Sequence, residues 1–202
     1  MKFAAVVLAA GRSTRMIIDK MGANKLLADL NGKPLLATTI KQIQASGVDE
    51  IVVVTGHQAQ AVEAALSHTK VVIIHNPHFA GGLSTSVRSG IAAAQNFDAA
   101  FICLGDMPLI RAADMQRMML KFNVKEGRML IAPTNAGQLG NPVLWGRNYF
   151  AALMALEGDR GARQFLEASR DQITEIAVEH DGISLDADTP EALAEIRKRS
   201  TN

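Results

Sequence analysis

The sequence lacks the features of a disulfide-bonded, membrane-spanning or nucleic-acid-coating protein. Its 202 residues include one cysteine, Cys103, so no disulfide framework can form within the chain. The formal net charge of +1 gives no overall field for capturing nucleic acid or an anionic membrane. No apolar run reaches membrane-spanning length, and Arg12 and Arg15 follow the apolar N-terminal run too closely for a signal peptide. We therefore expect a cytoplasmic protein with no nucleic-acid or membrane partner.

Linkers and repeats are absent as well. No Pro/Ser-rich stretch, low-complexity tract or internal repeat divides the chain. With 48% hydrophobic residues the chain can bury a sizeable core. We expect residues 1–202 to form a single domain.

Two familiar phosphate-binding motifs are also missing. A Walker A loop ends in Gly-Lys-Ser/Thr, and Gly22-Ala23-Asn24-Lys25-Leu26 does not supply it. A dinucleotide fingerprint needs a second glycine two positions after Gly11, where Ser13 stands. ATPase and dehydrogenase functions therefore lose their main support. The five histidines show no metal-like spacing among themselves.

The hydrophobic pattern alternates short β-rich runs with helical periods. The expected strands are 3–8, 51–55, 71–75, 99–104 and 129–132, and the expected helices are 35–45, 59–67, 86–95 and 113–122. Beyond about residue 136 this rhythm breaks into two short helical stretches, a last strand near 173–178 and a charged helix from Pro190. Continuous apolar strands are typical of parallel sheets covered on both faces. The pattern predicts a three-layer α/β/α, Rossmann-like fold with a mostly parallel sheet, whose ligands bind at the carboxyl ends of the strands.

The first expected strand runs into a turn of small residues with cations behind it. Backbone N–H groups of Ala9, Ala10 and Gly11 can approach an anion closely. The charges of a nucleoside triphosphate can be offset by the cations that follow, which are Arg12, Arg15 and Lys25. This segment favours a polyphosphate site. An ordinary strand-to-loop turn with surface arginines is the alternative.

Two places offer hard oxygen ligands that suit magnesium. Asp106 follows an apolar strand, so its carboxylate is expected in the crevice at the strand ends. Asp186 and Asp188 precede Thr189, an expected helix cap, although one of these aspartates can act as a cap itself. A third segment, 76–90, combines glycines with hydroxyls at an expected helix start. Such a start can contact a base, a ribose or a phosphate, or can use its hydroxyls for capping alone.

Short motifs then occur in the order found in one enzyme group. They are Leu8-Ala9-Ala10-Gly11, Arg15-Met16, Asn24-Lys25-Leu26, Gly32-Lys33-Pro34-Leu35, Gly105-Asp106-Met107-Pro108 and Asp186-Ala187-Asp188-Thr189-Pro190-Glu191. The chain resembles, nearly end to end, the nucleotidyltransferases related to the molybdenum cofactor enzymes. Three further segments look most like the molybdenum cofactor cytidylyltransferases: Ile74-His75-Asn76-Pro77, Gly82-Leu83-Ser84-Thr85-Ser86-Val87 and Gly140-Asn141-Pro142-Val143-Leu144.

The resemblance implies a nucleotide-diphospho-sugar transferase-like fold. It also implies transfer of CMP from CTP to the phosphate of molybdopterin-bound molybdenum, with pyrophosphate released. The expected cofactor is Mg²⁺, held by Asp106 and by Asp188, which is preferred over Asp186. The expected catalytic residues are Arg15, Lys25 and Asp106. CTP is expected to contact Leu8, Ala9, Ala10, Gly11, Arg12, Lys25, Asn76, Gly82 and Asp106, and the molybdopterin-type acceptor is expected to contact Ser84, Ser86, Arg88, Gly140 and Asn141. A target molybdoenzyme is a further expected partner.

Other functions stay open at this point. A guanylyltransferase of the same pathway is the closest rival, followed by a sugar-phosphate or polyol-phosphate cytidylyltransferase. Outside enzymes, the chain could be a chaperone that carries finished cofactor to an apo-enzyme, but the two metal aspartates argue against pure binding. Ala10 favours CTP, because guanylyltransferase relatives typically carry glycine there.

One departure from the resemblance concerns the loop before Lys25. Related chains usually run Arg-Met-Gly almost directly into the lysine, whereas residues 17–21 stand between Met16 and Gly22 here. We expect Arg15 to keep its role, because its spacing from the first strand is preserved. Replacement of Arg15 by Lys20 is the alternative.

Overall fold

The computed structural model describes residues 1–12, 24–158 and 161–200. Arg15 and the residues 17–21 lie outside the described residues, so their expected roles stay predictions. In the part of the chain that is described, no helix is both long and apolar enough to cross a bilayer.

A mixed, mostly parallel sheet forms the middle layer of the molecule. Its strand order is β10-β7-β9-β6-β1-β4-β5, and β8 pairs with β7. The strands are β1 (Phe3–Ala9), β4 (Glu50–Thr55), β5 (Val72–His75), β6 (Ala99–Leu104), β7 (Leu130–Asn135), β8 (Gln138–Leu139), β9 (Val143–Gly146) and β10 (Thr174–Ala177). In the centre, β1 pairs in parallel with both β4 and β6. A separate hairpin consists of β2 (Asp29–Leu30) and β3 (Lys33–Pro34).

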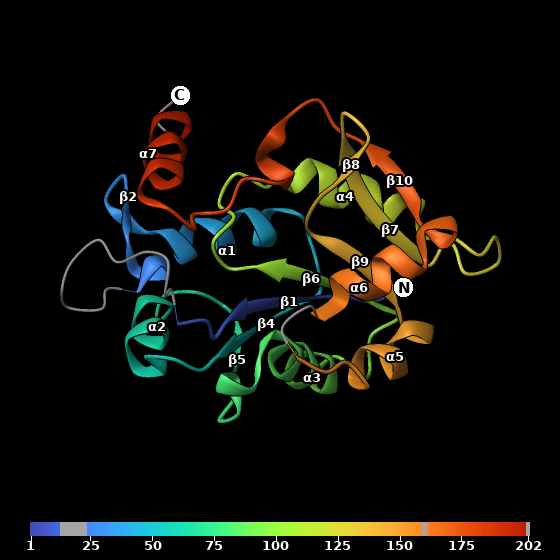
Figure 1. Ribbon diagram of the computed structural model, residues 1–202, viewed down its shortest axis with the longest axis horizontal. Coiled ribbons are helices and arrows are strands. Elements are labelled where there is room, and N and C mark those ends of the chain that lie inside the picture. Colours follow the sequence, from blue (N-terminus) through green and yellow to red (C-terminus); the bar gives the residue numbers. More distant parts are fainter. Residues whose placement is uncertain (13–23, 159–160, 201–202) are drawn as a thin grey trace.

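Helices cover both faces of this sheet (Figure 1). One face carries α1 (Leu35–Ala45), α2 (Ala59–Ala65) and α4 (Ala112–Lys121), and the other carries α3 (Leu83–Ala93), α5 (Phe150–Met154) and α6 (Gly161–Ala168). The last helix, α7 (Pro190–Arg199), packs against the β2–β3 hairpin. The predicted three-layer α/β/α fold with a mostly parallel sheet is confirmed.

The central strand β1 shows why the expected strands are apolar throughout. Ala5 and Val7 pack into the core under α1 and α4, whereas Ala4 and Val6 pack into the core under α3. Both sets of side chains are buried, so the strand has no polar face. Cys103 is likewise buried, and burial raises the pKa of its thiol. This cysteine packs as a small hydrophobe, as its apolar surroundings in the sequence predict.

The largest difference from the sequence pattern is β9. It lies between β6 and β7 and runs antiparallel to both, in a segment where the pattern shows only a break in rhythm. Only four residues form the strand, and they follow Pro142, so the local signal is short. Pairing on both sides stabilises β9, and such partners cannot be read from the segment itself.

Candidate functional site

Three loops meet at the carboxyl ends of the central parallel strands. The turn after β1 is joined to the loop after β4, because the N–H of His57 donates to the carbonyl of Ala10 at 3.2 Å. The end of β1 is joined to the loop after β6, because the N–H of Gly105 donates to the carbonyl of Leu8 at 3.1 Å. This is the edge at which open α/β sheets bind ligands.

Three aspartates gather at this edge. One carboxylate oxygen each from Asp106, Asp186 and Asp188 lies within 4.8 Å of the others. The two chain segments are held together by the N–H of Ala187, which donates to the carbonyl of Asp106 at 3.1 Å. Asp106 is only 8% exposed. The structure therefore brings together the three carboxylates that the sequence singled out for a metal.

The helix cap beside this cluster comes from a hydroxyl. Thr189 precedes α7, and its Oγ1 accepts the N–H of Ala192 at 3.2 Å. Pro190 occupies the first turn of the helix, where its missing N–H costs nothing. Neither Asp186 nor Asp188 makes this cap, so capping does not explain the aspartate pair.

Lys25 supplies the cation of the cluster. Its ammonium group bridges the carboxylates of Asp106 and Asp188. Burial acts to lower the pKa of Lys25, but attraction and hydrogen bonds to Asp106, together with those to Asp188, outweigh it and raise the pKa. The side chain therefore stays charged at neutral pH. The sequence placed Lys25 on the phosphates, whereas the structure shows it on the expected metal ligands.

Small residues pack closely next to the β1 turn. A Cβ on Gly56 would stand 2.8 Å from the Cβ of Ala10 and 2.7 Å from the Cβ of Phe79, so only glycine permits this approach. The guanidinium of Arg12 lies 5.5 Å from the centre of the Phe79 ring. This places Arg12 and Ala10, two expected nucleotide contacts, beside an aromatic ring that sequence reasoning missed. Phe79 carries no local signal, because only the fold brings it to Gly56.

Gly82 and Asn76 shape the start of α3. Gly82 has a φ of 99°, which side chains rarely adopt, and it directly precedes the helix. Asn76 is 1% exposed, and its Nδ2 donates to the hydroxyls of Thr85 at 2.9 Å and Ser86 at 3.1 Å. Its Oδ1 accepts the N–H of His78 at 2.9 Å. These internal bonds give Asn76 a positioning function, and its contact with the nucleotide stays a prediction.

Replacing Asn76 tests this positioning function. Asn76→Ala should lower the free energy of unfolding by about 2 kcal/mol, because three hydrogen bonds of a buried side chain are lost. Urea unfolding followed by circular dichroism measures the change. Unchanged stability together with weakened CTP binding would instead show that the side chain acts on the ligand.

The expected acceptor residues are not all at the aspartate cluster. Ser84 is buried at the start of α3, and Arg88 is half-buried one turn further along. Gly140 is held by Pro133, whose carbonyl accepts its N–H at 2.9 Å. The N–H of Asn141 donates to the carbonyl of Ile183 at 2.7 Å, in the short helix that precedes the aspartate pair. Their contact with an acceptor stays a prediction.

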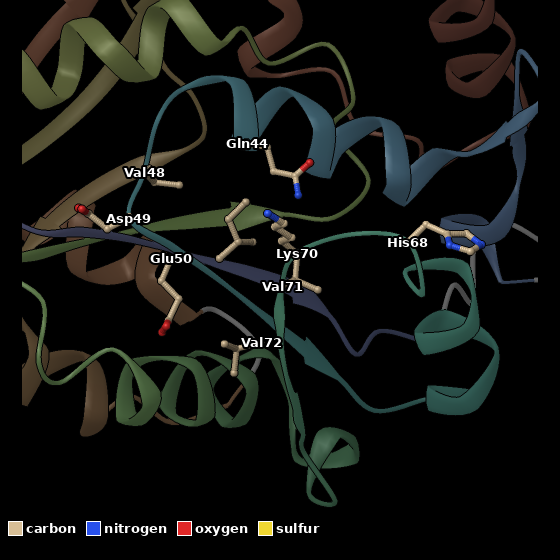
Figure 2. Close-up of a pocket in the computed structure, with 9 residues that line it drawn as sticks. Gln44, Val48, Asp49, Glu50, His68, Lys70, Val71 and Val72 are labelled. Carbon is tan, nitrogen blue, oxygen red and sulfur yellow. The ribbon is translucent and has the colours of Figure 1, made fainter.

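A separate open hollow of about 760 Å³ lies at the amino ends of β4 and β5 (Figure 2). It is lined by Gln44, Val48, Asp49, Glu50, Ile51, His68, Lys70, Val71 and Val72. Its charges are of both signs, and none of the three clustered aspartates lines it. The candidate active site is therefore at the carboxyl ends of the strands, opposite this hollow.

Known proteins are similar to this chain over most of its length. The molybdenum cofactor cytidylyltransferase of Escherichia coli K12 is 29% identical over 197 residues, which are 97% of this chain and 96% of that protein. The bifunctional protein GlmU of Sphingopyxis alaskensis is 32% identical over 158 residues, 78% of this chain. The matches span about a third of the first GlmU relatives' own length, 31% and 32% in two of them.

Solved structures of other proteins have the same fold as this chain. A Methanothermobacter nucleotidyl transferase superposes with a TM-score of 0.86 at 28% identity, covering 100% of this chain and 99% of that one. Rv0371c of Mycobacterium tuberculosis H37Rv in complex with manganese gives a TM-score of 0.81 at 25% identity, covering 98% and 99%. CMP:2-keto-3-deoxy-manno-octonic acid synthetase with CTP gives 0.78 at 16% identity, covering 100% and 99%, which shows the fold alone. The predicted nucleotide-diphospho-sugar transferase-like fold is thus confirmed.

A protein-family model also matches most of the chain. The family model of the MobA-like NTP transferase domain matches residues 5–173. That span contains the β1 turn, Lys25 and Asp106, which form the core of the site described above. The chain therefore belongs to the MobA-like nucleotidyltransferase family.

Proposed function

We propose that this chain transfers CMP from CTP to the phosphate of molybdenum-bound molybdopterin and releases pyrophosphate. The observation that carries nucleotidyl transfer is the cluster of Asp106, Asp186 and Asp188 with Lys25 at the strand ends. The cytidylyl and molybdopterin assignments are supported by the similarity to the Escherichia coli enzyme, which covers nearly all of both chains.

The chemistry of the cluster fits a hard divalent cation. Every donor is a carboxylate oxygen, and the 4.8 Å span is about twice a Mg²⁺–oxygen or Ca²⁺–oxygen bond of roughly 2.1–2.5 Å. We assign Mg²⁺ to Asp106 and Asp188, with Asp186 within reach. The bound cation would offset charge on the triphosphate and on the departing pyrophosphate.

The transfer itself needs no nucleophile from the protein. An oxygen of the acceptor phosphate attacks the α-phosphorus of CTP, and the bond from that phosphorus to pyrophosphate breaks on the opposite side. The β1 turn and Arg12 orient the phosphates, so the protein contributes alignment and electrostatics. Lys25 would share these carboxylates with the cation, and its ammonium group would offset charge on the phosphates once the triphosphate is bound.

A pyrophosphate-release screen tests the proposal. Each of the four nucleoside triphosphates is incubated with the protein, Mg²⁺ and purified molybdenum cofactor, and with the cofactor omitted as a control. We expect release with CTP that requires the acceptor. Release with GTP would indicate a guanylyltransferase, and no release with any nucleotide would contradict an enzymatic function.

Nucleotide choice should depend on the methyl group of Ala10. This residue is 5% exposed and packs beside Gly56 and Phe79. In this proposal the base binds next to it, and the methyl group would exclude the larger purine ring. One methyl group in a pocket changes discrimination by about 1–3 kcal/mol. Ala10→Gly should therefore lower the preference for CTP over GTP by roughly tenfold without abolishing activity.

The measurement is the ratio of kcat/KM for CTP and GTP with one acceptor. Ala5→Gly is the matched control, because the Ala5 methyl lies in the core in the middle of the same strand and belongs to none of the expected contacts. It should keep the wild-type ratio. A wild-type protein that prefers GTP would contradict both the cytidylyl assignment and the function given to Ala10.

A further inference from the structure

Asn24 carries a buried hydrogen-bond donor that no group in residues 1–12, 24–158 and 161–200 satisfies. The residue is 5% exposed, and its Nδ2 has no partner. Native proteins leave few buried donors unpaired, so each one calls for an explanation. Two other buried side-chain atoms are also unpaired in these residues, Oγ of Ser84 at the start of α3 and the ring nitrogen of Trp145. The Trp145 ring lies in the core cluster under α3 and α5, with its centroid 6.0 Å from that of Tyr149. Asn24 directly precedes Lys25, the lysine that pairs with Asp106 and Asp188.

The orientation of the Asn24 amide is fixed by its neighbours. Its Oδ1 accepts the N–H of Leu26 at 3.1 Å, and its main-chain carbonyl accepts the N–H of Leu27 at 2.9 Å. Exchanging the two ends of the amide would set its NH₂ against the Leu26 N–H. Leu26 is buried in the same core cluster as Leu36 of α1, which anchors the turn. The Nδ2 group is therefore held in place before any ligand arrives.

The neighbouring charges indicate which ligand would accept this donor. Lys25 follows directly and bridges Asp106 and Asp188. An NH₂ group cannot bind a cation, and the Oδ1 that could do so is committed to Leu26. The missing partner is therefore a hydrogen-bond acceptor whose negative charge is attracted to the neighbouring ammonium group. A phosphate oxygen has this chemistry. We propose that Asn24 is a further substrate-binding residue, whose Nδ2 donates to a phosphate oxygen of the bound triphosphate.

The proposal rests on nucleotidyl transfer but not on the identity of the base or the acceptor. Inorganic tripolyphosphate with Mg²⁺ is therefore the probe, and isothermal titration calorimetry measures its binding. Asn24→Ser keeps an oxygen that can cap the turn and removes the long donor. We expect this variant to bind tripolyphosphate about tenfold more weakly, with its thermal midpoint close to wild type. Asn24→Asp, which keeps the shape, should bind more weakly still because it adds repulsion.

A matched control comes from a similar turn outside the site. Asn123 also accepts a main-chain N–H, from Lys125 at 3.0 Å, and Asn123→Ser should leave tripolyphosphate binding unchanged. Wild-type affinity in both Asn24 variants would show that the residue only caps the turn. Weaker binding of CTP with unchanged binding of tripolyphosphate would place the contact on the nucleoside and overturn the phosphate assignment. Failure of wild type to bind tripolyphosphate would also overturn it, and pyrophosphate release from nucleotides reports separately on the proposed function.

Discussion

Asp106→Asn should reduce the rate of pyrophosphate release by a factor on the order of 10³ at saturating Mg²⁺. The substitution keeps the shape of the side chain but removes a charged ligand from the cluster. Charge stabilisation of this kind supplies several kcal/mol, and each 1.4 kcal/mol or so is about tenfold in rate. The fold should change little, because Lys25 keeps its contact with Asp188.

A charge-matched control separates the cluster from surface electrostatics. Asp181 lies in the short helix η5 (Asp181–Ile183), where it pairs with Arg199 away from the three aspartates. Asp181→Asn removes the same charge and should retain a near-wild-type rate. Circular dichroism during heating checks that both variants fold. A rate close to wild type in Asp106→Asn would remove this residue from the proposed metal site.

The fold was predictable because its signals are local. Each apolar run of the central sheet is continuous, so the strands β1, β4 and β6 could be located within a few residues. The start of α3 was expected at residue 86, whereas the helix begins at Leu83, since Gly82 with its φ of 99° marks the boundary. The strand β9 could not be predicted, because its stability comes from partners on both sides.

The candidate site also has parts that the sequence predicts and parts that it does not. Parallel strands end at one edge, so the position of Asp106 at that edge was expected from topology. Its approach to the later aspartate pair was implied by the family resemblance. The position of Lys25 was not expected. Its carboxylate partners are 81 and 163 residues away in sequence, and no local pattern states which of several anions a lysine contacts. Asn24 was missed for a related reason, because an unpaired donor exists only in the folded chain.

Lys25→Met should tighten the binding of a divalent cation to the nucleotide-free protein while abolishing most turnover. In the structure, the ammonium group of Lys25 bridges Asp106 and Asp188, the two carboxylates proposed to hold Mg²⁺. Any cation must displace Lys25 or share these oxygens with it, so the ion pair weakens binding of the cation alone. Removing a charge at this range from a partly buried site should increase affinity about tenfold. Turnover should fall by roughly 10²–10³-fold, because Lys25 no longer offsets charge on the phosphates.

Mn²⁺ binding followed by electron paramagnetic resonance measures the affinity without reference to activity. Lys33→Met is the control, since it removes an exposed lysine in β3 that does not belong to the cluster. It should change neither the Mn²⁺ affinity nor the rate. An unchanged affinity in Lys25→Met would mean that the lysine and the cation do not compete, whatever the rate. Tighter binding with slower turnover would show that a residue needed for catalysis also limits cation binding before the nucleotide arrives. The cation would then enter mainly together with the triphosphate, which draws Lys25 away from the carboxylates.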